Sequence, residues 1–146
     1  MSVKMTLDVA AMRDDFFQDT ALIGIVSALP AYRFCWLINR KFGTNFVRDS
    51  DSDVVLRGSD KEEHFFPIYK YHTDSQGFNY FIYRLKSGKE TLLPEIKQLD
   101  YLWMIQSITP EKDAEKIIHY LREITEIQLA QIITSDRLRN LNNLLV

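Results

Sequence analysis

The sequence YLWMIQSITPEKDAEKIIHYLREITEIQLAQIIT, residues 101 to 134, decides the fold class of this 146-residue chain. It begins with a run of large apolar residues, 101 to 106, that is typical of a buried strand. Residues 109 to 111 (TPE) predict a helix start, because a hydroxyl residue, a proline at the first helical position and an early acid suit a helix N-terminus. Residues 127 to 134 are a second apolar run and predict a second strand. The segment therefore predicts a strand, a helix and a strand.

The first third of the chain predicts the same order of elements. Residues 21 to 26 form a short apolar run that suits a buried strand, and residues 45 to 48 suit a second strand. Between them we expect Ser27 to cap a helix that runs from about Ala28 to Phe42 and ends at Gly43. Both expected helices have one apolar stripe at helical spacing. The stripes are Ala31, Phe34, Cys35, Leu37, Ile38 and Phe42 in the first helix, and Ala114, Ile117, Ile118, Leu121 and Ile124 in the second.

A β-hairpin is expected between these two units. Residues 64 to 71 and 78 to 85 are rich in aromatic and β-branched residues, and turn-forming residues separate them. Pro67 predicts an edge position or a bulge in the first of these strands. We therefore expect one α+β domain over residues 1 to 146, with a mixed, mostly antiparallel sheet and two main helices on one face. Ferredoxin-like or regulatory-domain-like strand-helix-strand units flanking the hairpin fit this order.

Composition and charge exclude several classes of protein. Hydrophobic residues make up 46% and charged residues 26% of the chain, which fits a globular domain and not a disordered one. The net charge of −2 gives no overall basic field for nucleic acid or acidic lipid, and the single cysteine, Cys35, has no partner for an internal disulfide. The apolar residues 21 to 29 are too few to cross a membrane, and acidic rather than basic residues precede them. We expect a cytoplasmic protein with no membrane partner.

The sequence lacks the motifs of phosphate-binding loops and metal sites. Its five glycines are too scattered to form a phosphate-binding loop. Residues 49 to 63 are expected as a polar connection, and DSDSD within it begins like a calcium loop. However, Val54 and Asp60 stand where that loop needs glycine and glutamate. The histidines, His64, His72 and His119, lack the spacing of metal ligands. We therefore expect no metal and no cofactor.

Two apolar features suit a contact surface. Tyr32 and Trp36 lie four residues apart on a flank of the first helix that is away from its apolar stripe. The sequence also ends on three apolar residues, Leu144, Leu145 and Val146. We interpret both features as an interaction surface, either for a homodimer or for an unidentified protein partner.

Glu95 and Asp100 stand beside a strong structural signal in the stretch LLPEIKQLDYLWMIQS, residues 92 to 107. Pro94 predicts an extended backbone that leads into the strand, and Asp100 is expected at the strand's start. Two acids in different surroundings act as general acid and base when a polar partner such as Tyr101 lies nearby. Acids at the start of a strand also accept hydrogen bonds from the backbone. We favour this structural role and keep a ligand-facing role for Pro94, Glu95, Asp100 and Tyr101 as the alternative.

These residues carry a resemblance to a known family. LPEIKQLDY, residues 93 to 101, resembles the signature of the bacterial IPExxxVDY family, with Leu93 in place of isoleucine and Leu99 in place of valine. The ALIGI segment, the helix after it with Tyr32, Arg33 and Asn39, and the ending NNLLV also look like this family. The family has about this length and no assigned activity. The resemblance therefore implies a stand-alone bacterial domain and provides no catalytic residues.

Three hypotheses for the function remain. The first is a non-catalytic, cytoplasmic module for regulation or protein binding, and the missing catalytic motifs favour it. The second is a small enzyme or small-molecule-binding protein with a pocket near Glu95, Asp100 and Tyr101. The third is a binder of single-stranded nucleic acid through the aromatic hairpin, which interleaves aromatic residues with Lys70 and Arg84. The net charge argues against the third hypothesis.

Overall fold

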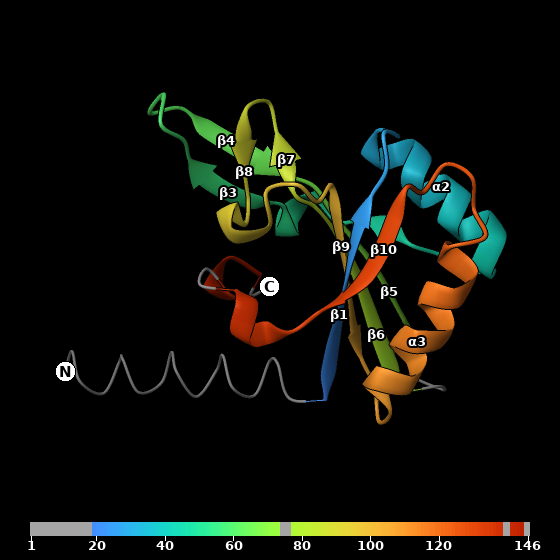
Figure 1. The fold of residues 1–146 in the computed structure, drawn as a ribbon. Helices are drawn as coiled ribbons and strands as arrows, with labels where there is room; N and C mark the ends of the chain where they lie inside the picture. Colours follow the sequence, from blue (N-terminus) through green and yellow to red (C-terminus); the bar gives the residue numbers. More distant parts are fainter. Residues whose placement is uncertain (1–18, 74–76, 139–140, 145–146) are drawn as a thin grey trace.

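A six-stranded antiparallel sheet forms the centre of the computed structural model, which describes residues 19–73, 77–138 and 141–144 (Figure 1). Its strands, in spatial order, are β10 (Leu129–Ile133), β1 (Thr20–Val26), β9 (Tyr101–Gln106), β6 (Phe78–Arg84), β5 (Ile68–Thr73) and β2 (Val47–Arg48). Two helices of the described residues, α2 (Ala31–Phe42) and α3 (Pro110–Leu121), lie on one face of this sheet. The expected α+β class, with a mostly antiparallel sheet and two helices, is confirmed.

The second strand-helix-strand unit is split by β1, which lies between its two strands. β9 and β10 are both antiparallel to β1, so they run parallel to each other with β1 between them, and α3 connects them. With β6 beside β9, four neighbouring strands have the order β10-β1-β9-β6, which is the ferredoxin-like order. The segment between α2 and β6 contains β2 and β5, which extend the sheet beyond β6.

The first core fills the space between the sheet and the two helices. Alternate residues of the central strands, among them Ile23, Ile25 and Trp103, point toward the helices and are completely buried. The stripes expected from the sequence face them. Phe34, Cys35, Leu37 and Ile38 of α2 are buried, as are Ala114, Ile117, Ile118 and Leu121 of α3 and Ile124 beyond it. The helical period of the sequence therefore identified this core.

A second core covers the opposite face of the sheet. There Leu22, Leu102 and Met104 pack against residues from short elements, such as Phe66 and Ile96. Because the central strands are buried on both faces, they are continuous apolar runs rather than alternating ones. The short elements are β3 (Val54–Arg57), β4 (Glu63–Phe66), β7 (Lys86–Ser87), β8 (Glu90–Thr91) and the 3₁₀ turns Ser50–Ser52, Pro94–Ile96, Ser135–Arg137 and Leu141–Leu144.

Pro67 separates two strands where the sequence predicted one. Residues 63 to 66 form β4, which pairs with β3, whereas β5 begins at Ile68 and pairs with β6. Proline has no backbone N–H to donate to a strand ladder, so the chain passes there from the small sheet to the central one. β3 was also missed, because its apolar residues are few and lie within the polar stretch 49 to 63.

The first helix begins later than expected. α2 starts at Ala31, directly after Pro30, and not near Ala28. A proline disfavours helical dihedral angles in the residue before it, so the helix does not extend back toward Ser27. The Ser27 hydroxyl therefore does not cap α2 and donates instead to the backbone oxygen of Glu126, 2.9 Å away.

Leu144 does not belong to an exposed surface, contrary to the expectation from the sequence. Its side chain is completely buried in the second core. The Tyr83 hydroxyl donates to the Leu144 backbone oxygen at 2.5 Å, and the Asn143 side chain donates to Leu92 at 3.0 Å. Leu145 and Val146 lie outside the described residues. The end of the described chain therefore closes the second core.

We expect Gly24→Ala to destabilise the protein, because Gly24 lies in β1 in close contact with the second core. A Cβ atom there would lie 2.4 Å from Cδ1 of Leu99 and 2.9 Å from Cγ1 of Ile133. Over-packing of this kind lowers the free energy of unfolding by about 1–3 kcal/mol. Urea unfolding followed by circular dichroism measures the loss, and an unchanged midpoint would contradict this packing.

Candidate functional site

The residues of the Pro94–Tyr101 motif lie where the central sheet meets the second core. Pro94 begins the 3₁₀ turn Pro94–Ile96, so it does not set an extended backbone as the sequence suggested. Glu95 is half-buried within this turn, and Leu93, Ile96 and Leu99 around it are buried. A proline at the first position of a helical turn is favoured because its missing N–H is not needed there.

Asp100 fixes the ends of several strands to one another. Its Oδ2 accepts a hydrogen bond from the backbone N–H of Ser27 at 2.9 Å, and its Oδ1 pairs with Nζ of Lys86 at 2.7 Å. Its own backbone bonds to Ile25 at 2.8 Å and to Leu85 at 2.9 Å. Both carboxylate oxygens are thus engaged by groups within the fold.

Tyr101 is enclosed by the first core. Its side chain is completely buried and stacks on Phe34, with ring centroids 3.9 Å apart. Its hydroxyl donates to the backbone oxygen of Leu29, and the guanidinium of Arg84 lies 4.8 Å from the centre of its ring. Burial raises the pKa of the Tyr101 hydroxyl well above its ordinary value. The Tyr101 side chain is therefore closed off from solvent by the fold.

Three clefts of the described chain lie away from this motif. One of about 230 Å³ is bordered by β1, β10 and Glu111, and one of about 380 Å³ by β2 and β5. A third, of about 210 Å³, lies between the C-terminal ends of α2 and α3. Glu95, Asp100 and Tyr101 line none of these three clefts.

The exposed side of α2 carries two large aromatic residues. The side chains of Tyr32 and Trp36 are 69% and 58% exposed, as their position off the apolar stripe suggested. The guanidinium of Arg40, one turn further along, lies 5.0 Å from the centre of the Trp36 ring. We call Tyr32, Trp36 and Arg40 the α2 stripe, which is distinct from the buried apolar stripe of the same helix. Trp, Tyr and Arg are the residues most enriched among those that dominate binding at protein interfaces.

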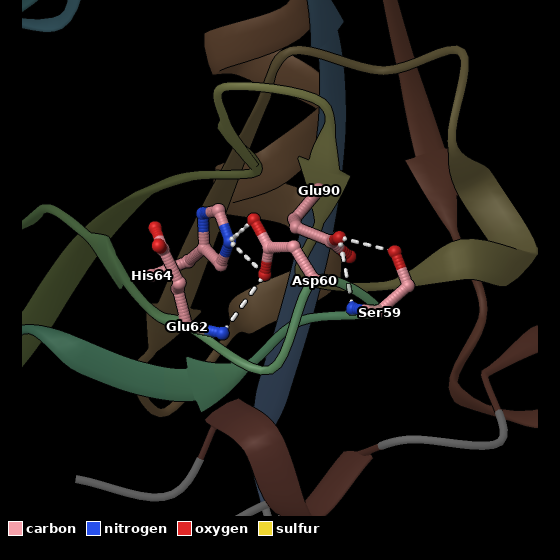
Figure 2. Close-up of polar contacts among 5 residues, drawn as sticks. All are labelled: Ser59, Asp60, Glu62, His64 and Glu90. Carbon is pink, nitrogen blue, oxygen red and sulfur yellow. Dashed lines mark hydrogen bonds and ion pairs between the residues drawn. The ribbon is translucent and has the colours of Figure 1, made fainter.

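A second cluster joins the two small sheets on the opposite face. It consists of Asp60, His64 and Glu90, whose ligand-type atoms all lie within 4.8 Å of one another. Asp60 lies in the loop between β3 and β4, His64 in β4 and Glu90 in β8, and Figure 2 shows Asp60 between the other two. Nε2 of His64 lies 3.0 Å from both carboxylate oxygens of Asp60. We call these three residues the hairpin cluster.

Backbone donors hold both carboxylates of the hairpin cluster. The N–H of Glu62 donates to Asp60 at 3.0 Å, and the N–H and hydroxyl of Ser59 donate to Oε1 of Glu90 at 3.1 and 2.9 Å (Figure 2). The pKa of Asp60 lies below its usual range, mainly because of the Glu62 bond and secondly because of His64. The pKa of His64 is raised, mainly by the bond to Asp60.

The sequence did not identify the hairpin cluster. Asp60 and His64 have helical (i, i+4) spacing in a segment that is not helical, and Glu90 follows 26 residues after His64. Only the pairing of β3 with β4 and the return of the chain through β8 bring them together. One local signal was present, because Gly58 allows the backbone to approach Glu90 and His64 closely.

The other polar features of the sequence are engaged in the fold. Asp53 pairs with Arg48 at 2.5 Å and Asp49 with Lys70 at 3.1 Å, so these two acids of the DSDSD run bind neighbouring cations. The pKa of Asp49 is lowered, first by a hydrogen bond from Ser52 and then by Lys70.

The aromatic side chains of the expected hairpin are mostly packed within the fold. Of the eight aromatic residues in the segments 64 to 71 and 78 to 85, Phe65 alone is exposed. The others pack, for example Tyr80 against Trp103.

We expect Asp100→Ala to destabilise the protein more than Lys86→Met does. The first change leaves the buried Ser27 N–H without its acceptor and lowers the free energy of unfolding by about 1–3 kcal/mol. The second removes only a partly exposed ion pair and lowers it by less than about 1 kcal/mol. Urea unfolding of both variants measures the difference. Equal losses would show that the ion pair, rather than the backbone contact, is what matters.

Comparisons with known proteins identify no relative. No protein-family model matches the chain, and no curated protein or solved structure matches it at a significant level. The resemblance of residues 93 to 101 to the IPExxxVDY signature therefore stays a prediction. Among the described residues, no helix has both the length and the apolar character that crossing a membrane requires.

Proposed function

We propose that this protein is a non-catalytic binding module that docks an acidic, partly apolar segment of a protein partner on the exposed side of α2. The observation that carries the proposal is the α2 stripe. Tyr32 and Trp36 expose large rings to solvent, although the apolar face of their helix packs in the first core. Exposed rings with few rotatable bonds supply contact area at a low entropic cost, which suits an interface.

The charge of α2 indicates the chemistry of the partner. The helix contains Arg33, Arg40 and Lys41, all exposed, and no acid. One acid near it is Glu126, whose pKa is lowered mainly by a hydrogen bond from Thr125 and to a smaller extent by Lys41 and Arg33. A cationic, aromatic surface on a chain of net charge −2 complements an acidic segment with apolar side chains. The cleft beside Lys41 and Phe42 adds a concave region at the end of the helix.

A homodimer through the α2 stripe is disfavoured by charge. Two copies of the stripe would bring Arg40 and its neighbouring cations face to face, and like charges across an interface oppose association. Pairing of the sheet edges remains a route to a homodimer, because Leu129 and Ile132 of the edge strand β10 are 40% and 41% exposed. Analytical ultracentrifugation distinguishes a monomer from such a dimer.

The geometry supports the other two functions less well. A pocket at Glu95, Asp100 and Tyr101 would need these groups to face a ligand, but Asp100 and Tyr101 bind groups of the fold itself. Nucleic-acid binding through the hairpin would need exposed rings, and most of its rings are packed.

A cytoplasmic, bacterial setting is part of our proposal. It is supported by the family resemblance and by a single, buried cysteine.

We expect Trp36→Glu to abolish partner binding with almost no effect on folding. The exposed ring contributes little to the core, so the melting temperature should barely change, whereas a buried interface would lose its main anchor. Phe65→Ser is the matched control, because Phe65 is 54% exposed but lies on the opposite face. With the three proteins as bait in host extract, the partner is the protein retained by wild type and by Phe65→Ser but not by Trp36→Glu.

Fluorescence of the purified complex then tests the site directly. Of the two tryptophans, Trp36 is exposed and Trp103 completely buried, so acrylamide should quench Trp36 alone in the free protein. A bound partner should protect Trp36, and its affinity should fall as salt increases because opposite charges meet. Unchanged quenching in the complex, or a partner that also binds the Trp36→Glu variant, would refute the proposal.

A further inference from the structure

We propose that the hairpin cluster is a metal site, in which Asp60, His64 and Glu90 bind one divalent transition-metal ion of the Zn²⁺ class. The ion would join the β3–β4 hairpin to the β7–β8 hairpin. This site is independent of the α2 stripe, because the two lie on opposite faces of the central sheet (Figure 1). Failure of one proposal therefore leaves the other unaffected.

The chemistry of the three groups selects the class of metal. One imidazole nitrogen and two carboxylate oxygens form a mixed set of ligands. Ca²⁺ and Mg²⁺ prefer sites built from oxygen alone, whereas imidazole suits zinc and its neighbours in the periodic table. Zn²⁺ accepts nitrogen and carboxylate ligands and imposes no geometry through its d electrons. The histidine is therefore what distinguishes this cluster from a purely acidic surface patch.

The spacing of the groups is close to that of a coordinated ion. Two ligand atoms bound to the same tetrahedral zinc at about 2.1 Å lie about 3.4 Å apart. Nε2 of His64 already lies 3.0 Å from each oxygen of Asp60, and the three ligand atoms span at most 4.8 Å. Coordination of one ion would therefore need the three ligand atoms to shift by about an ångström.

The chain around the cluster is built to hold these side chains in place. A Cβ atom on Gly58 would lie 2.7 Å from Cδ and Oε1 of Glu90 and 2.8 Å from Cδ2 of His64, so a glycine makes room for both. The two bonds from Ser59 fix Oε1 of Glu90 and orient its carboxylate. Such contacts to the groups that bind a metal fix their orientation and raise its affinity.

The position of the hairpin cluster lets an ion enter from solvent and lets a bound ion stabilise the fold. The side chain of Asp60 is 49% exposed and that of His64 is 17% exposed, so an ion reaches the site from solvent while the imidazole stays fixed. Three protein ligands leave a coordination position for water. An isolated two-stranded hairpin is marginally stable. A bound ion that crosslinks two of them therefore stabilises the elements that cover the second core.

The experiment is a titration of the full chain, without a histidine tag, with ZnCl₂ at about pH 7.5, because zinc binds the deprotonated forms of carboxylate and imidazole. We expect one ion per chain by calorimetry, with a dissociation constant below about 10 μM. The melting temperature should rise with zinc concentration, because the ion binds the folded state. A dissociation constant above about 10 μM, or no binding at all, would overturn the proposal.

Variants decide whether the ion lies at the hairpin cluster. His64→Gln and Glu90→Gln should each weaken zinc binding at least about tenfold, because a neutral amide is a poor ligand for zinc. His119→Gln is the matched control: His119 also faces an acid at (i, i+4), Glu123 at 3.8 Å, and should bind as wild type does. Binding that is lost in His119→Gln, or unchanged in Glu90→Gln, would contradict the site. If His64→Gln does not fold, Glu90→Gln alone gives the answer.

Gly58→Ala tests the same site without removing a ligand. Its methyl group would displace Glu90 or His64, since both lie closer than van der Waals contact allows. We expect weaker zinc binding, by at least about tenfold, in a protein that is folded without the metal. Circular dichroism in the presence of a chelator confirms folding. Full zinc affinity in this variant would show that the ion binds elsewhere.

Discussion

Burial of the central strands on both faces is the constraint on which the rest of this structure depends. β1 and β9 lie side by side inside the sheet, and nearly all of their side chains are buried. A sheet that is apolar on both faces needs two covers. The helices α2 and α3 provide one cover, and the short hairpins, the Pro94–Ile96 turn and the C-terminal turn provide the other. Each cover presents to solvent the groups from which a binding surface can be built.

Asp100 links these two covers at one corner of the fold. It stands directly before β9, and its carboxylate accepts the Ser27 N–H just after β1 and pairs with Lys86 of β7. One side chain thus fixes the end of a central strand, the start of the segment that leads to α2 and one of the small hairpins. This explains why Asp100 resembles a residue of a reaction centre in the sequence but binds groups of the fold itself in the structure.

The two proposed sites would bind partners of opposite charge. The α2 stripe combines exposed aromatic rings with exposed positive charge, which favours association with an acidic, partly apolar partner. The hairpin cluster brings an imidazole and two carboxylates together in a space that Gly58 keeps open, which favours a cation. Because the central sheet separates them, a metal-stabilised second cover and a partner-binding first cover can coexist in one small domain.

The sequence by itself determined the α+β class, the strand at residues 101 to 106, the helix start at Thr109-Pro110 and the apolar stripes of both helices. These features depend on neighbouring residues, because hydrophobic periodicity and the preference for proline at the start of a helix are local. Tertiary structure alone decided that Pro67 divides one apparent strand between two sheets and that Leu144 is buried. It also brought Glu90 to Asp60 and His64. Contacts between distant segments depend on which faces remain to be covered once the sheet has formed, and local patterns do not contain this information.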